Sequence, residues 1–107
     1  MTLVDEDINP PHTWSNDALQ AAAWGGHEAV VKLLLAAGAD VNAPAGKYGN
    51  ALEAASQHGY EAVVKLLLNA GADVNAPAGN NGNAIAAASR YGHEAVVKLL
   101  LRAGAKI

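Results

Sequence analysis

A period of 33 residues constrains this chain more than any other feature of its sequence. The stretch Gly59–Asn75 occurs almost unchanged at Gly26–Asn42, and it occurs again at Gly92–Ile107. A fixed period of this length is typical of proteins built from stacked structural units, in which each unit contacts only its neighbours. The repeated segment is therefore expected to be the structural unit of the chain.

Each unit is predicted to contain an extended turn and two helices. In the second copy, Asn50 is the expected N-cap of a first helix over 51–58, because its side-chain oxygen can accept an unpaired N–H of the first turn. A second helix is expected over 61–69, with Gly71 as its left-handed C-cap. The equivalent N-caps of the first helices in the other two copies are Asp17 and Asn83.

The second helix of each copy is apolar around most of its circumference. Glu61, Lys65 and Asn69 share one narrow arc, and apolar residues cover the rest. A surface helix needs an apolar stripe of only ~100°. The apolar arc of this helix is wider than a single neighbouring unit can cover. The helix is therefore predicted to lie between the units before and after it.

The repeated motifs resemble those of the ankyrin repeat. Gly-His-Glu-Ala-Val-Val-Lys-Leu-Leu-Leu stands at 26–35 and 92–101, and Gly-Ala-Asp-Val-Asn-Ala stands at 38–43 and 71–76. The family's Thr-Pro-Leu-His is replaced by an Asp or Asn followed by Ala and then Leu or Ile, so the cap residue is kept and the Pro is lost. The close likeness of the copies indicates a recent duplication or a deliberate design.

The resemblance implies an all-α solenoid of three helix-turn-helix repeats joined by hairpin-like turns. The expected segments are an N-terminal arm at 1–8 and repeats at 9–42, 43–75 and 76–107.

The bulk composition excludes several classes of function. A net charge of −3 gives no electrostatic basis for binding nucleic acid or an anionic membrane. The chain has no cysteine, which excludes disulfides and thiol-bound zinc. No apolar run reaches the ~20 residues of a membrane helix. The acidic start, Met1–Asp7, is unlike a signal peptide, so an intracellular, cytoplasmic protein is expected. We also expect the chain to have no cofactor.

The resemblance also implies that the chain binds a protein partner, on a concave face formed by the hairpin tips and the first helices. The copies differ from one another at those places, and either recognition or unconstrained drift can produce such differences. Trp14 and Trp24 favour recognition, because tryptophan is enriched at binding hot spots, although the N-terminal arm could instead fold over either ring. The candidate partner-binding residues are Trp14, Gln20, Trp24, Lys47, Tyr48, Glu53, Gln57, His58, Asn80, Arg90 and Tyr91.

Residues that often serve in catalysis or metal binding are spread by the period. His27 and His93 lie two periods apart, and Asp40 and Asp73 lie one period apart, which is too far for a shared metal. We interpret the histidines as helix-start residues and the aspartates as turn residues. No paired carboxylates, phosphate-binding glycine loop or nucleophile–base pair is evident, so we expect neither an enzyme nor a metal site.

The last copy raises a second hypothesis for function. Its second helix keeps the apolar residues of the internal copy, including Val97 and Leu101, although no unit follows it in this chain. Terminal repeats normally present a polar outer face. Three explanations are open: further repeats in a longer protein, end-to-end self-association through Val97 and Leu101, or exposure at some cost in stability. The alternative function is therefore a structural, designed or excised scaffold without a specific partner.

Overall fold

Three pairs of helices make up the computed structural model, which describes residues 12–44, 49–77 and 82–106, with side chains from residue 18 onward. We name the pairs repeats 1, 2 and 3 in chain order. Their helices are α2 His12–Gly25 and α3 Glu28–Ala36, α4 Ala51–Gln57 and α5 Glu61–Asn69, and α6 Ala84–Arg90 and α7 Glu94–Arg102. The expected N-terminal arm lies outside the described residues.

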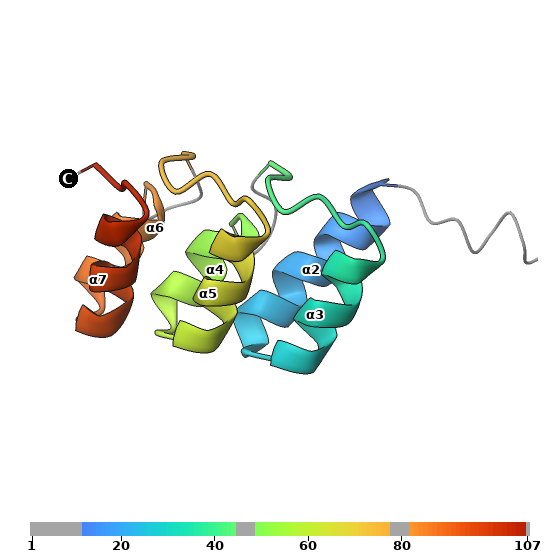
Figure 1. Ribbon diagram of the computed structural model, residues 1–107, viewed down its shortest axis with the longest axis horizontal. Coiled ribbons are helices and arrows are strands. Elements are labelled where there is room, and N and C mark those ends of the chain that lie inside the picture. Colours follow the sequence, from blue (N-terminus) through green and yellow to red (C-terminus); the bar gives the residue numbers. More distant parts are fainter. Residues whose placement is uncertain (1–11, 45–48, 78–81, 107) are drawn as a thin grey trace, which may run out of the picture.

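The helices form two layers that run along the molecule (Figure 1). The first helix of each repeat packs on that of the next, so α4 contacts both α2 and α6. The second helices follow the same order, with α5 between α3 and α7. One apolar core of small residues passes through the first helices, including Ala54, Ala55 and Ala88. The predicted all-α solenoid is confirmed.

Most of the predicted helix ends are confirmed. The side chain of Asn50 accepts the N–H of Glu53 at 2.7 Å, and that of Asn83 accepts the N–H of Ala86 at 2.9 Å. Two residues after the end of each second helix stands a glycine with a φ between +94° and +99°. These glycines are Gly38, Gly71 and Gly104.

The predicted N-cap Asp17 is wrong. Helix α2 begins at His12, directly after Pro11, so Asp17 lies inside it and residues 13–15 are helical. Repeats 2 and 3 place Gly49 and Gly82 before their caps, with φ values of +80° and +90°. Repeat 1 has Asn16 at this position, so the glycine that turns the chain before the cap is missing and the helix continues.

The prediction that the second helix lies between two neighbours is confirmed for α5. Val63, Val64 and Leu67 are buried in the core cluster, and Leu66 and Leu68 are partly buried against it. Fully burying one Val or Leu side chain contributes about 1.5–3 kcal/mol. Much of the stability of this repeat therefore depends on the repeats that flank it.

Asparagines connect the turns of successive repeats. The side chain of Asn42 donates to the carbonyl of Gly71 at 3.0 Å and accepts the N–H of Asp73 at 2.6 Å. The carboxylate of Asp40 accepts the N–H of Asn42, which confirms Asp40 as a turn residue. The next repeat has the equivalent bonds. The Asn75 side chain donates to the Gly104 carbonyl and accepts the Lys106 N–H, and the Asp73 carboxylate accepts the Asn75 N–H.

Candidate protein-binding surface

Two of the predicted partner-binding residues are buried between repeats. Gln20 is 3% exposed and Glu53 is 2% exposed, so their expected place on an open helix face is wrong. The Gln20 amide nitrogen donates to the carbonyl of Pro44, in the connector that follows repeat 1. Glu53 lies against Gly49, at the place where a Cβ atom of that residue would stand. A signal was present in the sequence, because the polar residues Gln20 and Glu53 are replaced by Ala86 in the last of the three copies.

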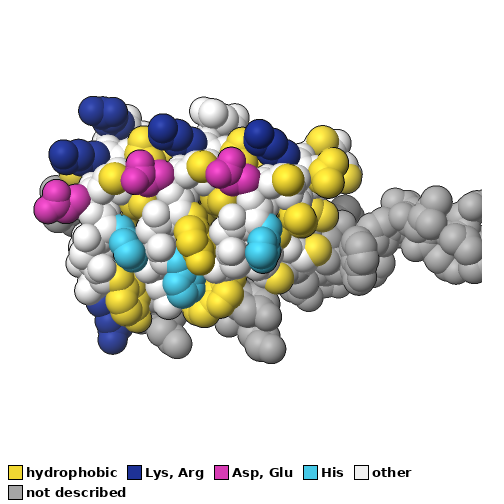
Figure 2. Space-filling view, turned by 90° about the horizontal axis from the view of Figure 1, so that it is seen from below, with side chains coloured by type: hydrophobic (Ala, Val, Ile, Leu, Met, Phe, Trp, Pro, Cys, Tyr) yellow, Lys and Arg dark blue, Asp and Glu magenta, His cyan; other side chains and the backbone are white. Residues whose placement is uncertain are grey.

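The other described candidates gather at one edge of the molecule. This edge is formed by the loops that join the first helix to the second helix of each repeat, and we name it the short-loop edge. Figure 2 shows histidines along it, with hydrophobic side chains between them. The residues of the short-loop edge are Trp24 and His27 in repeat 1, Gln57, His58 and Tyr60 in repeat 2, and Arg90, Tyr91 and His93 in repeat 3.

Three rings of this edge are in contact across repeats 1 and 2. The ring of Trp24 meets that of His58 edge-on, with the centroids 4.3 Å apart, and His58 lies 5.7 Å from Tyr60. Trp24 and Tyr60 are partly buried against the core, so they help to hold the stack together and leave part of their surface open to solvent. The Nε2 atom of His58 is buried and has no hydrogen-bond partner among the described residues.

Glycines after the first helices provide the space for aromatic rings from the following repeat. Gly26 has a φ of +72°, and a Cβ atom there would lie 2.9 Å from the Tyr60 ring. At Gly59, with a φ of +74°, the added atom would lie 2.5 Å from the His93 ring. The interpretation of His93 as a helix-start residue therefore needs an addition, because its Nε2–H also donates to the Gln57 carbonyl at 2.9 Å across the repeat boundary.

The most open part of the short-loop edge belongs to repeat 3. Tyr91 is 48% exposed, and the guanidinium carbon of Arg90 lies 5.7 Å from the centre of its ring. Arginine and tyrosine are enriched among the residues that dominate the energy of protein interfaces. This pair is therefore the most accessible anchor among the described candidates.

Four predicted residues cannot be placed on this surface. Lys47, Tyr48 and Asn80 lie outside the described residues, and so does the side chain of Trp14, whose backbone belongs to the first turn of α2. Their part in binding stays a prediction.

Both ends of the stack expose apolar side chains. In repeat 3, Leu101 is 41% exposed and Val97 is partly buried, as expected for an outer flank that no described residue covers. The sequence interpretation missed the opposite end, where Val30 is 45% exposed and Leu33 is 69% exposed. The helical wheel of the second helix contained this signal. Its apolar arc has one flank toward the following repeat and one toward the preceding repeat, and in repeat 1 the described residues cover only the first of these flanks.

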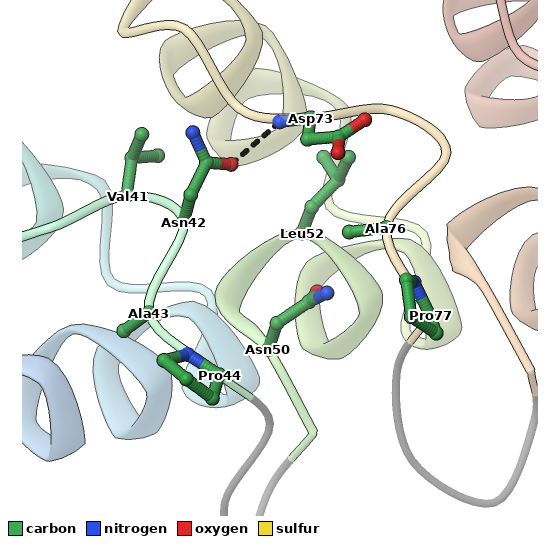
Figure 3. A pocket seen from close by; sticks show the side chains of 9 residues that line it. All are labelled: Val41, Asn42, Ala43, Pro44, Asn50, Leu52, Asp73, Ala76 and Pro77. Atoms are coloured by element: carbon green, nitrogen blue, oxygen red, sulfur yellow. Dashed lines mark hydrogen bonds between the residues drawn. The ribbon is translucent and has the colours of Figure 1, made fainter.

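A hollow of about 260 Å³ lies between the connectors after repeats 1 and 2 (Figure 3). Its walls include the polar side chains of Asn42, Asn50 and Asp73. Asn42 bridges to the neighbouring turn, and the side-chain oxygen of Asn50 caps α4. The carboxylate of Asp73 accepts the N–H of Asn75. These polar groups already serve the fold, so we assign the hollow to the packing of the connectors.

Within the described ranges, no group of three or more histidine, aspartate or glutamate side chains could hold a metal ion. None of the helices described is both long enough and apolar enough to cross a membrane.

The sequence matches a protein-family model described as "Ankyrin repeats (3 copies)", over residues 1–78 and again over residues 47–107. No curated protein matches the chain. The two matched ranges together span the whole sequence, and the described part has the helix pairs that the model implies. Ankyrin repeats are generally protein–protein interaction modules and are typically not enzymes. The chain belongs to the ankyrin-repeat family.

Proposed function

We propose that this chain is a non-catalytic module that binds a protein partner through the short-loop edge and the adjoining ends of its first helices. The observation that carries the proposal is the set of exposed or partly exposed side chains at this edge that change from copy to copy. Trp24 of repeat 1 is replaced by Gln57 in repeat 2 and by Arg90 in repeat 3. The residue that follows it, Gly25, is replaced by His58 and by Tyr91. Apolar positions buried between repeats, such as Val31 and Val64, keep their identity, whereas the buried polar position of Gln20 and Glu53 varies.

The chemistry of this edge suits protein recognition. Interface hot spots are rich in Trp, Tyr and Arg, because these side chains bury a large area and also offer polar groups. Packing already restrains Trp24 and Tyr60, so they lose little conformational entropy when a partner covers them. Tyr91 and Arg90 extend the same surface toward the open end of the stack. A partner can therefore contact all three repeats along one line.

A phage-displayed library of random peptides, selected against the full chain, would supply a probe for this surface. The affinity of the selected peptides is then measured by fluorescence anisotropy for the parent protein and for variants. The variant with Arg90→Ala and Tyr91→Ala should lose about thirtyfold or more in affinity, since truncating a hot-spot residue costs at least about 2 kcal/mol. Its stability should be unchanged, because both side chains are exposed.

The matched control is Lys65→Ala, a truncation of an exposed side chain on α5, away from the short-loop edge. It should leave the affinity unchanged. Trp24→Phe is preferred to Trp24→Ala, since Trp24 packs against the core and a larger truncation would also destabilise the fold. Peptides that bind the parent protein and the double variant equally well would contradict the proposed surface.

The second candidate function is a scaffold that self-associates through the ends of its stack. The exposed apolar side chains of Val30, Leu33 and Leu101 favour it. An intracellular location, predicted from the sequence, stays a prediction.

A further inference from the structure

The contact between neighbouring repeats consists of two matched sets of residues. One set faces the following repeat, and it includes Val31 and Val64, which are fully buried in repeats 1 and 2. The other set faces the preceding repeat, and it includes Val63 and Val96, which are 1% exposed in repeats 2 and 3. Every internal junction therefore joins one forward-facing set to one backward-facing set.

Repeat 3 presents a forward-facing set that nothing in the described residues covers. We name it the C-terminal face, and it comprises Ala86, Ser89, Val97 and Leu101. These residues line an open groove of about 370 Å³, whose wall also includes Ile85. The positions equivalent to Ser89, at Ala23 and Ser56, are fully buried, and the one equivalent to Val97 in repeat 2 is Val64. The groove thus has the surface on which a further repeat would pack.

Repeat 1 presents the complementary backward-facing set, which we name the N-terminal face. It comprises Ala18, Ala21, Val30 and Leu33. The equivalent residues in repeat 3 are Ala84, Ala87, Val96 and Leu99, so all four types are identical. Ala84, Ala87 and Val96 are buried against repeat 2, and Leu99 is partly buried. The N-terminal face therefore carries the side chains that already fill an internal junction.

The glycine positions of the short-loop edge show the same match. The Tyr60 ring lies over Gly26, and the His93 ring lies over Gly59, each from the following repeat. At Gly92, nothing lies within 4 Å of the place where a Cβ atom would stand. His27, the residue equivalent to Tyr60 and His93, is exposed in repeat 1. One end of the stack offers an open glycine position. The other end offers the His27 ring, which lies against Gly25 of its own repeat and not over a glycine of a preceding repeat.

We propose that a second copy of this chain docks its N-terminal face on the C-terminal face, with the register of an internal repeat junction. The His27 ring of the second copy would lie over Gly92 of the first. The occupant is a copy of the same chain, because the two faces carry the residue types of the chain's own junction between repeats 2 and 3, except that Ala86 stands where that junction has Glu53. The contact is head-to-tail and does not close on itself, so assembly continues into open chains.

Two variants separate this arrangement from others. Leu101→Glu places a charge on the C-terminal face, and Leu33→Glu places one on the N-terminal face. Sedimentation velocity across the micromolar to millimolar range should show a parent protein whose mass grows with concentration beyond that of a dimer. Each variant alone should stay monomeric. An equimolar mixture should form a complex with twice the monomer mass and grow no further, because each variant retains the face that the other has lost.

The matched control is Ala95→Glu, which adds the same charge to α7 at a position that is exposed in all three repeats. It should assemble like the parent protein. Circular dichroism checks that each variant is folded. Ser89→Arg is a second variant of the C-terminal face, at a residue that is itself exposed.

Three results would overturn the proposal. The first is a parent protein that stays monomeric over the whole concentration range. The second is a dimer that survives Leu33→Glu but not Leu101→Glu, which would mean that two C-terminal faces meet each other. The third is a mixture of the two folded variants that forms no complex. Each of these readouts is independent of peptide binding at the short-loop edge.

Discussion

Gly59 and Gly92 form a matched pair in which one glycine lies under a ring and the other does not. Their φ values are +74° and +75°. Replacing either with alanine forces a Cβ atom into the left-handed region, at a cost of about 1–2 kcal/mol. At Gly92 this is the whole expected loss, since nothing lies within 4 Å of the added atom.

Gly59→Ala should cost more, because the added Cβ atom would lie 2.5 Å from the His93 ring. The ring must move, and its hydrogen bond to the Gln57 carbonyl is then lost, which costs about another 1 kcal/mol. We therefore expect a total loss of about 2–3 kcal/mol, against about 1–2 kcal/mol for Gly92→Ala. This is a sizeable share of the ~5–15 kcal/mol stability of a typical domain.

The free energy of unfolding is measured by urea denaturation with far-UV circular dichroism, at low protein concentration so that the ends of the stack stay free. A double-mutant cycle with His93→Ala isolates the contact. In that background, Gly59→Ala should cost no more than Gly92→Ala does. Equal losses for the two glycine variants in the parent background would refute the reasoning that the ring contact across the repeat boundary stabilises the stack.

Other substitutions test the remaining contacts by the same unfolding measurement. Leu67→Ala, in the core of α5, should lose about 2–5 kcal/mol. Leu33 is 69% exposed, so Leu33→Ala should lose less than about 0.5 kcal/mol. Losses of similar size for Leu67→Ala and Leu33→Ala would contradict the assigned burial. Asn42→Ala removes two bonds between turns and should cost about 1–2 kcal/mol, whereas the exposed Asn69→Ala should be nearly neutral. Asn50→Ala should cost about 1 kcal/mol through loss of the α4 cap, and no loss would argue against that cap.

Much of the fold could be predicted because the repeat presents each local signal more than once. The Asn caps, the C-cap glycines and the apolar second helix all depend on short-range chemistry. The second helix was predicted at 61–69, and the structure places it at Glu61–Asn69. The start of α2 was missed because copy 1 was assumed to share the turn of the other copies, whereas Asn16 replaces the glycine that makes this turn.

The candidate surface was harder to predict, because exposure in a stack depends on the neighbouring repeat. Gln20 and Glu53 are polar and vary between copies, which is typical of a surface. Both are nevertheless buried, because the next repeat covers that side of the first helix. The same cause operates in reverse at the ends, where Leu33 and Leu101 are exposed although their counterparts in the other repeats are partly buried. A helical wheel shows which side chains share a face, but not whether that face has a neighbour.

The central claim is that repeated residues hold the stack together while the variable residues of the short-loop edge contact the partner. The most direct test is a series of ¹H–¹⁵N correlation spectra of the full chain, recorded during titration with a selected peptide. The account predicts that the largest shift changes fall at Trp24, at residues 57–60 and at residues 90–93, with little change along the exposed side of α5. Changes centred on α5, or on Val97 and Leu101 of the C-terminal face, would contradict it.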